Sequence, residues 1–148
     1  MKTKLAVALA AFTLGVPGVA LAAQYPTVDF NSWTVRTLDG KKHTGIAPHT
    51  TFKHCKSNPA TRVTAVGDYK KATVGQTFRT SWYLNSSLVS TSVYSWKKTH
   101  GTSRWSLFKK SGNPIPDGRY DLLLTHNGHT FAESWLKLGT KKKHGKPC

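Results

Sequence analysis

Apolar and polar side chains alternate with a period of two along much of the chain after residue 23. In the segment 78–84, one face would carry Phe78, Thr80, Trp82 and Leu84 and the other Arg79, Ser81 and Tyr83. Successive side chains of a β-strand point to opposite faces, so this pattern predicts a strand. The segments 88–96, 104–107 and 119–125 alternate in the same way. No window longer than ten residues shows the apolar spacing of an amphipathic helix.

Turn-forming residues separate these runs. Asn127-Gly128 lies between two alternating stretches and is a strong hairpin signal. A rigid loop is expected at 113–118 and a softer turn at 85–87. Further strands are expected at 27–35 and 62–66, with a weaker candidate at 50–54, whereas 38–59 is turn-rich and reads as a long loop. Seven or eight short strands at intervals of about ten residues predict an all-β fold, an antiparallel β-sandwich.

The first 23 residues have the pattern of a signal peptide. Lys2 and Lys4 precede an apolar stretch, and the segment ends in Ala20-Leu21-Ala22-Ala23. A charged start, an apolar centre and small residues at the cleavage site are typical of export. We therefore expect a cleaved signal peptide at 1–23, a sandwich domain at 24–139, a basic tail at 140–148, and a secreted or periplasmic protein. An uncleaved anchor is the alternative, and no stable membrane insertion is expected after cleavage, since Gly15 and Pro17 interrupt the apolar stretch.

The mature chain is strongly basic. The whole chain carries a formal charge of +16, which becomes +14 when Lys2 and Lys4 leave with the signal peptide. A small domain with such a field attracts polyanions. Outside the cytoplasm these would be anionic polysaccharide, a cell-surface polymer or an acidic protein. Nucleic acid would be a partner only if it is extracellular.

Two cysteines, Cys55 and Cys148, lie in the mature chain. In an oxidising compartment an isolated pair is expected to form one disulfide, which would stabilise the fold by about 4 to 5 kcal/mol on the chain-entropy model. It would also tie down the basic tail. An intermolecular bridge and a metal site that includes a cysteine remain the alternatives.

The segment 76–138 resembles an exported bacterial module of the immunoglobulin-like class. The resemblance rests on the run from Trp82 to Leu107, the Gly-x-Pro-x-Pro-x-Gly-x-Tyr-like loop at 112–120, and the closing Asn127-Gly128 hairpin. It implies an immunoglobulin-like β-sandwich and an accessory or binding role. It carries over no catalytic residue, since fold alone does not decide function. The antibody-type Cys…Trp…Cys spacing is absent.

Lysines and arginines form the best candidate binding site. Between residues 69 and 116 there are eight basic residues and no acid. We expect the pairs Lys97-Lys98 and Lys109-Lys110 to converge with Arg104 on one patch. A second cluster closes the chain and includes Lys141, Lys142 and Lys143. Clustered cations bind anionic polymers through counterion release, although such lysines also solubilise a domain and protect strand edges.

An aromatic side chain beside this patch could stack on sugar rings or bases. Trp82 and Trp105 lie on apolar faces and are expected in the core, whereas Trp96 precedes Lys97 at a strand end and is the candidate for exposure. Three histidines, His43, His49 and His54, are weak candidates for zinc or copper ligands, but their spacing matches no standard motif. We therefore assign no metal and no cofactor.

Catalytic signals are poor. Only six acidic residues are present, and no nucleophile elbow, phosphate-binding glycine loop or His-Glu-x-x-His segment occurs. The sequence predicts an exported, non-catalytic module that binds an anionic polymer or surface. A protein-interaction subunit or inhibitor and a periplasmic metal-binding protein are the alternatives. The ligand and the oligomeric state are not encoded in any motif.

Overall fold

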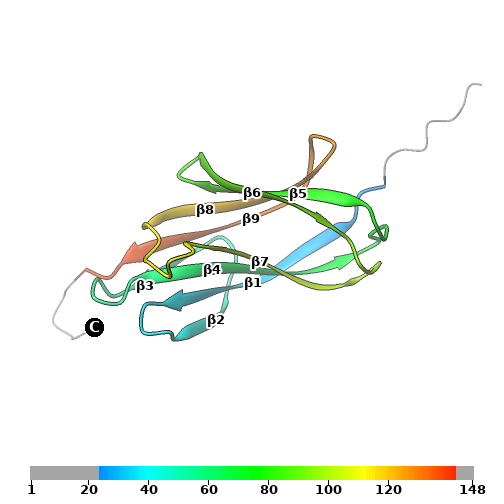
Figure 1. Cartoon of the computed structure of the whole chain (residues 1–148). Helices are drawn as coiled ribbons and strands as arrows, with labels where there is room; N and C mark the ends of the chain where they lie inside the picture. The colour runs from blue at the N-terminus through cyan, green and yellow to red at the C-terminus, as the bar shows by residue number, and fades with distance from the viewer. Residues whose placement is uncertain (1–23, 143–148) are drawn as a thin grey trace, which may run out of the picture.

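The computed structural model describes residues 24–142, which form two packed β-sheets (Figure 1). The positions 1–23 and 143–148 lie outside this range. The signal peptide, Lys143, Cys148 and the end of the basic tail therefore remain predictions. No described residue is helical. The described part of the chain also contains no helix long and apolar enough to span a membrane.

One sheet has four strands in the order β2-β1-β4-β7, and the other has five in the order β3-β9-β8-β5-β6. The strands are β1 (Thr27–Thr37), β2 (Lys42–Ile46), β3 (Thr50–His54), β4 (Ala60–Lys70), β5 (Thr77–Leu84), β6 (Ser87–Ser95), β7 (Gly101–Phe108), β8 (Gly118–His126) and β9 (His129–Thr140). The all-β fold is thus confirmed.

Two details differ from the sequence prediction. The described residues hold nine strands rather than seven or eight, because β2 forms inside the segment 38–59 that reads as a loop. A strand of five residues that includes Gly45 has too little apolar alternation to be found by pattern. The pair β3–β9 is also parallel, with Thr50 opposite Leu136, whereas the other ladders are antiparallel. Alternation of apolar and polar residues predicts the face of the sheet to which each side chain points. It does not predict whether the neighbouring strand runs parallel or antiparallel.

The core lies between the two sheets and is rich in tryptophan. Trp33 and Trp82 pack edge to face with ring centroids 5.8 Å apart. The indole Nε1 of Trp33 donates to the buried Ser134 Oγ across the sandwich at 3.1 Å. This hydrogen bond satisfies two polar groups that would otherwise be costly to bury. It also joins β1 to β9, one strand from each sheet.

The predicted Asn127-Gly128 hairpin is confirmed. His126 pairs with His129 at the end of the β8–β9 ladder. Both turn residues have positive φ, 48° at Asn127 and 78° at Gly128. Two successive positive φ values are what a two-residue type I′ turn requires, and Asn-Gly adopts them at low cost.

Candidate anion-binding face

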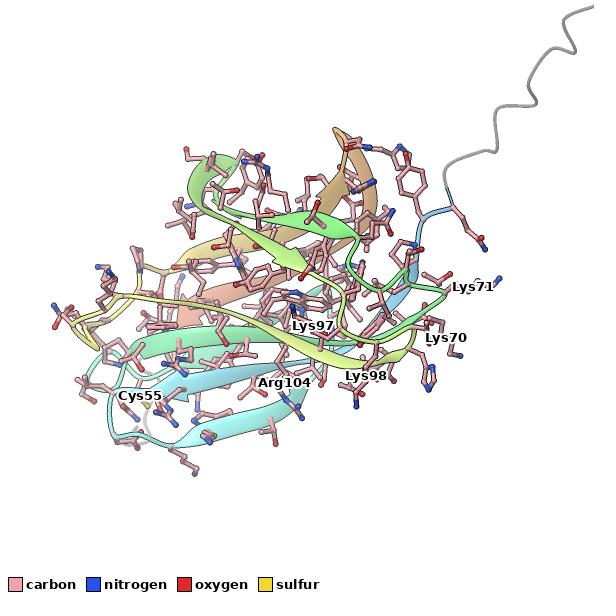
Figure 2. All side chains as sticks on the ribbon, turned by 45° about the vertical axis from the view of Figure 1, so that its right-hand side comes forward. Cys55, Lys70, Lys71, Lys97, Lys98 and Arg104 are labelled. Carbon is pink, nitrogen blue, oxygen red and sulfur yellow. The ribbon has the colours of Figure 1, made fainter. Side chains whose placement is uncertain are left out.

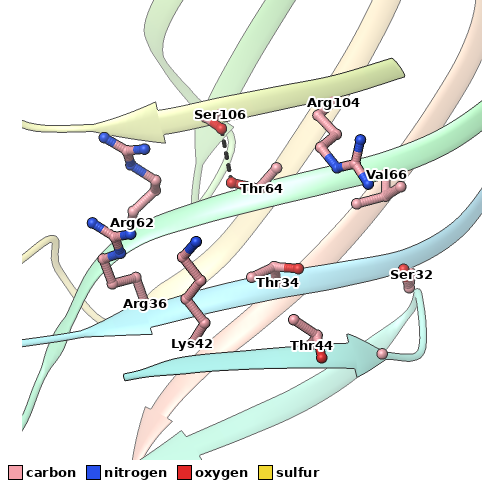
Figure 3. Close-up of a pocket in the computed structure, with 11 residues that line it drawn as sticks. Ser32, Thr34, Arg36, Lys42, Thr44, Arg62, Thr64, Val66, Arg104 and Ser106 are labelled. Carbon is pink, nitrogen blue, oxygen red and sulfur yellow. Dashed lines mark hydrogen bonds between the residues drawn. The ribbon is translucent and has the colours of Figure 1, made fainter. Parts of the chain in front are cut away.

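The four-stranded sheet turns one face to the core and the other to solvent. Along β1, Trp33 and Val35 are buried, whereas their neighbours Thr34 and Arg36 are only half-buried. Along β4, Val63 and Ala65 are buried in the same way. Strand alternation therefore places a continuous set of polar side chains on the outer face, which is hollowed into a groove of about 410 Å³ (Figure 3). We call this surface the cationic face; its lining residues are Ser32, Thr34, Arg36, Lys42, Thr44, Gly45, Arg62, Thr64, Val66, Arg104 and Ser106.

Strand register arranges three cations in one row across this face. Arg36 is opposite Lys42 on β2 and opposite Arg62 on β4. Neighbouring strands lie about 4.8 Å apart, so three positive side chains start from adjacent positions. Figure 3 shows all three side chains at the same end of the groove. Like charges directly opposite each other destabilise a sheet. We call this set, Lys42, Arg36 and Arg62, the cationic row.

No carboxylate neutralises the cationic row within residues 24–142. The two ion pairs of the described chain join His54 to Asp117 and Arg119 to Asp121, away from this face. Asp68 belongs to β4 but lies at the far end of the strand from Arg62. Its carboxylate accepts hydrogen bonds from Thr102 Oγ1 at 2.5 Å and Asn31 Nδ2 at 2.7 Å. These two bonds lower the pKa of Asp68 and use its acceptor capacity on neutral groups.

An aromatic ring holds one member of the row in place. The Arg62 guanidinium carbon lies 4.1 Å from the centroid of the Phe108 ring. Phe108 is opposite Arg62 in the β4–β7 ladder and is 47% exposed. A guanidinium stacked on an exposed ring keeps its hydrogen-bonding edge available to a ligand. The row and its aromatic neighbour thus span all four strands of the sheet.

Hydroxyl groups fill the centre of the groove. Thr34 is opposite Thr64, and Thr64 is opposite Ser106. The Thr64 and Ser106 hydroxyls hydrogen-bond to each other at 2.7 Å, as Figure 3 shows. Beyond these hydroxyls Arg104 faces Val66, about 13 Å along the strands from the Arg62 position. The face therefore offers cations at both ends and neutral hydroxyls between them, which is suited to an extended anionic ligand.

The expected convergence of Lys97-Lys98 and Lys109-Lys110 is wrong. The first pair precedes β7 and the second follows it, so the whole strand, about 26 Å, separates them. Arg104 lies between the two pairs, on the cationic face. The two lysine pairs would meet only if a tight turn joined them, and an extended strand lies between them instead. The pair Lys109-Lys110 does continue from Phe108, next to the cationic row.

Lys97 and Lys98 meet a different pair of lysines. Their loop hydrogen-bonds to the β4–β5 connection through Ala72 N and Thr99 O at 3.0 Å. Figure 2 shows Lys70 and Lys71 at the same end of the sandwich as Lys98. This group is far from Lys109-Lys110 and from Lys141-Lys142, which follow β9 at the opposite end. Basic residues thus occur at both ends of the molecule.

The prediction that Trp96 is exposed is wrong. Trp96 is 3% exposed and stacks on Phe78, with ring centroids 4.2 Å apart. It also packs on Tyr69 at 4.4 Å. Directly after β6, the chain turns inward and places Trp96 in the core. The two lysines that follow Trp96 in the sequence give no sign of this burial. Trp82 and Trp105 are buried, as expected.

The three candidate histidines have other roles. His43 packs on Phe52 and His49 on Trp135. The buried His54 contacts Asp117 Oδ1 through Nε2 and the Cys55 carbonyl through Nδ1. Across residues 24–142, no group of three or more histidine, cysteine, aspartate or glutamate side chains is placed to hold a metal ion.

Sequence reasoning missed Arg36, Lys42 and Arg62, which are the members of the cationic row. Arg36 and Lys42 are separated by one turn, but Arg62 is 26 positions from Arg36 in the sequence. Alternation alone places Arg62 and Thr64 on the polar face of their strand. The register that sets Arg62 beside Arg36 is a tertiary property and has no local signal. No protein-family model and no curated protein matches this chain.

Proposed function

We propose that this protein is a non-catalytic binding module that holds an anionic polymer on its cationic face. The observation that carries the proposal is the cationic row. Lys42, Arg36 and Arg62 occupy directly adjacent positions without a carboxylate partner in the described chain. A sheet pays for such an arrangement in stability, and a polyanion would remove the repulsion on binding.

The chemistry of the face favours sulfate, phosphate or carboxylate groups on a long chain. Arg36 and Arg62 present planar forks suited to two-point contacts with oxyanions. The hydroxyls of Thr34, Thr64 and Ser106 would bind sugar hydroxyls or ester oxygens between the charged groups. Lys109 and Lys110 would extend the contact beyond the end of β7. Anionic polysaccharide or a cell-surface polymer fits these groups, and an acidic protein would compete for the same face.

We further propose that the sandwich belongs to the immunoglobulin-like class. The order β9-β8-β5-β6 corresponds to the G-F-C-C′ order of a variable-type sheet, with β4 and β7 in the places of strands B and E. The Tyr120 hydroxyl donates to the Pro116 carbonyl, four residues upstream, at 2.6 Å. This contact resembles the tyrosine corner of immunoglobulin-type sandwiches.

Export and the Cys55–Cys148 bridge belong to the same proposal. Strand β9 ends at Thr140, opposite His54, and Lys141 N donates to the His54 carbonyl at 2.8 Å. The chain therefore approaches its last residues directly beside Cys55. Only five residues separate Lys142 from Cys148 in the sequence. A disulfide at this position fits a secreted or periplasmic protein.

The test is heparin affinity of the mature, oxidised protein, measured by calorimetry over a series of salt concentrations. The variant R36Q/K42Q/R62Q should bind at least about tenfold more weakly at low salt. The slope of log K against log salt should fall by roughly 2 to 3, by analogy with phosphate contacts in nucleic acids.

A control variant removes the same net charge elsewhere. K53Q/R79Q/K137Q neutralises three exposed cations on strands of the five-stranded sheet. It should change the affinity less than about threefold, since diffuse charge contributes only weakly. Equal losses in the two variants would show that net charge, rather than the cationic face, attracts heparin. Preferred binding of an acidic protein that heparin does not displace would favour an interaction subunit.

A further inference from the structure

The outer strand β6 lacks the charged side chains that usually protect the edge of a sheet. It is hydrogen-bonded to β5 on one side and ends the five-stranded sheet on the other. Its nine residues include no charge, proline or glycine. The three other outer strands each carry a cation: Lys42 in β2, Lys53 in β3 and Arg104 in β7. In so basic a protein, an edge of this length without charge is a ready template for another strand.

The apolar side chains of β6 are exposed. Leu88 is 57% exposed, Val89 47%, Val93 60% and Tyr94 48%. They represent four of the seven large hydrophobic residues that are exposed in the described chain. Concentration of apolar side chains on one edge strand indicates that the edge is covered by a partner.

The sequence of β6 identifies that partner. Read from Thr91 in both directions, Ser-Leu-Val-Ser-Thr-Ser-Val-Tyr-Ser is nearly the same. In an antiparallel pair centred on Thr91, Val89 would face Val93 and Leu88 would face Tyr94, with serines opposite serines. A two-fold interface requires a surface that is complementary to itself. The sequence of this strand has that property, and its backbone carries one register shift, at Val89.

We propose that two copies of this chain pair antiparallel through β6, with the two-fold axis at Thr91. The two five-stranded sheets would then join into one continuous sheet, and the pairs Val89–Val93 and Leu88–Tyr94 would each occur twice. The register shift of the β5–β6 ladder falls between the partners of Ser90 and Leu88, to one side of the axis.

The charges around β6 favour the antiparallel arrangement. Lys97 and Lys98 follow the strand. In an antiparallel pair they would lie beside the β5–β6 turn of the second copy, and the two lysine pairs would be at opposite ends of the joined strands, at least about 27 Å apart. A parallel pair would bring four lysines together. The antiparallel dimer therefore keeps the repulsion between two basic copies low.

Sedimentation of the mature, oxidised protein over a range of concentrations tests this proposal. We expect a reversible monomer–dimer equilibrium. T91K should weaken dimerisation at least about tenfold, since it places two like charges opposite each other on the axis. Thr91 is exposed in the monomer, so the variant should fold normally by circular dichroism. The control T51K adds the same charge to β3, the opposite edge of the sheet, and should dimerise like the unmodified protein.

A charge-swap pair makes the result specific to the axis. T91K and T91E alone should each dimerise at least about tenfold more weakly than the unmodified protein, whereas an equal mixture should form the heterodimer because Lys and Glu then face each other. A monomeric unmodified protein at every concentration would overturn the proposal. So would an unchanged dimerisation constant in T91K, an equal loss of dimerisation in T51K, or a mixture that associates no better than either variant alone. A dimer that reduction alone dissociates would assign the contact to a disulfide instead.

Discussion

The outer faces of the two sheets carry the same kinds of cation in different surroundings. On the five-stranded sheet, Arg119 donates to Asp121 Oδ1 through Nε at 2.9 Å and Nη2 at 2.7 Å. Its guanidinium also lies 4.5 Å from the Trp135 ring centroid. On the four-stranded sheet, Arg36 and Arg62 are direct neighbours and have no such carboxylate within the described residues. Arg119 thus has a carboxylate partner beside it, whereas the cationic row leaves its charge for an external anion.

This difference separates two uses of a basic residue. A cation with a carboxylate partner stabilises its own sheet, and its field is largely cancelled at a distance. A row of unpaired cations costs stability and projects a field into solvent. The net charge of the chain counts paired and unpaired cations together. Three variants test whether the distinction holds.

The largest expected effect comes from adding an acid to the cationic face. T64E places a carboxylate next to Arg62 on the same strand and diagonal to Arg36. Heparin affinity should fall at least about tenfold, since an internal partner replaces the ligand and repels it. Stability should change by less than about 0.5 kcal/mol, because the new ion pairs offset the lower strand preference of glutamate and the loss of the exposed Thr64–Ser106 hydrogen bond.

Urea unfolding and calorimetry measure the two quantities for T64E. T51E makes the same change on β3 and serves as the control. If T64E and T51E reduce heparin binding equally, the distinction between the two faces fails.

A smaller effect is expected at Asp117, an acid that is fully partnered at the end of the sandwich. Its Oδ1 contacts His54 Nε2, and its Oδ2 accepts from Thr140 Oγ1 at 2.7 Å. Burial raises the pKa of Asp117, but the hydrogen bonds from Thr140 and His54 outweigh it, and the pKa lies below the usual value. D117N should cost about 1 kcal/mol at neutral pH, a figure reduced for the partial exposure of the carboxylate.

The pH dependence of D117N follows from the lowered pKa. The folded state binds the Asp117 proton more weakly than the unfolded state, so the carboxylate stabilises the fold above its ordinary pKa. This contribution is lost as the pH falls below about 4 and through the folded-state pKa. Unfolding free energies of the two proteins should therefore converge as the pH falls through the folded-state pKa. A difference that stays constant with pH would show that Asp117 is not charged in the native contact.

The smallest effect is expected at the Arg119–Asp121 ion pair. D121N removes the carboxylate from Arg119, whose side chain is half exposed, and should cost about 0.5 kcal/mol in urea unfolding. Heparin affinity should rise less than about twofold, since Arg119 and the opposite Lys137 make two adjacent cations rather than a row of three. A gain of several fold would mean that any unpaired arginine suffices, and it would remove the distinction between the faces.

Local sequence patterns predicted most strands of this fold, but not which strands pair with each other. Alternation located most strands and placed Trp82 and Trp105 in the core, and Asn127-Gly128 located the last hairpin. The short β2 and the parallel β3–β9 pair were not predicted. Trp96 was misplaced because its burial depends on Phe78 and Tyr69, which come from other strands.

The sequence by itself determined an all-β chain with a strong positive charge, because a two-residue period and a net charge are properties of the chain alone. It also determined the symmetric pattern of β6, which can be read along one strand. Only the tertiary structure decided which cations meet. Arg36 and Arg62 become neighbours through the β1–β4 register, and Lys97 and Lys109 are separated by the length of β7. Register and strand order depend on how two sheets close over one core, and no local segment encodes that closure.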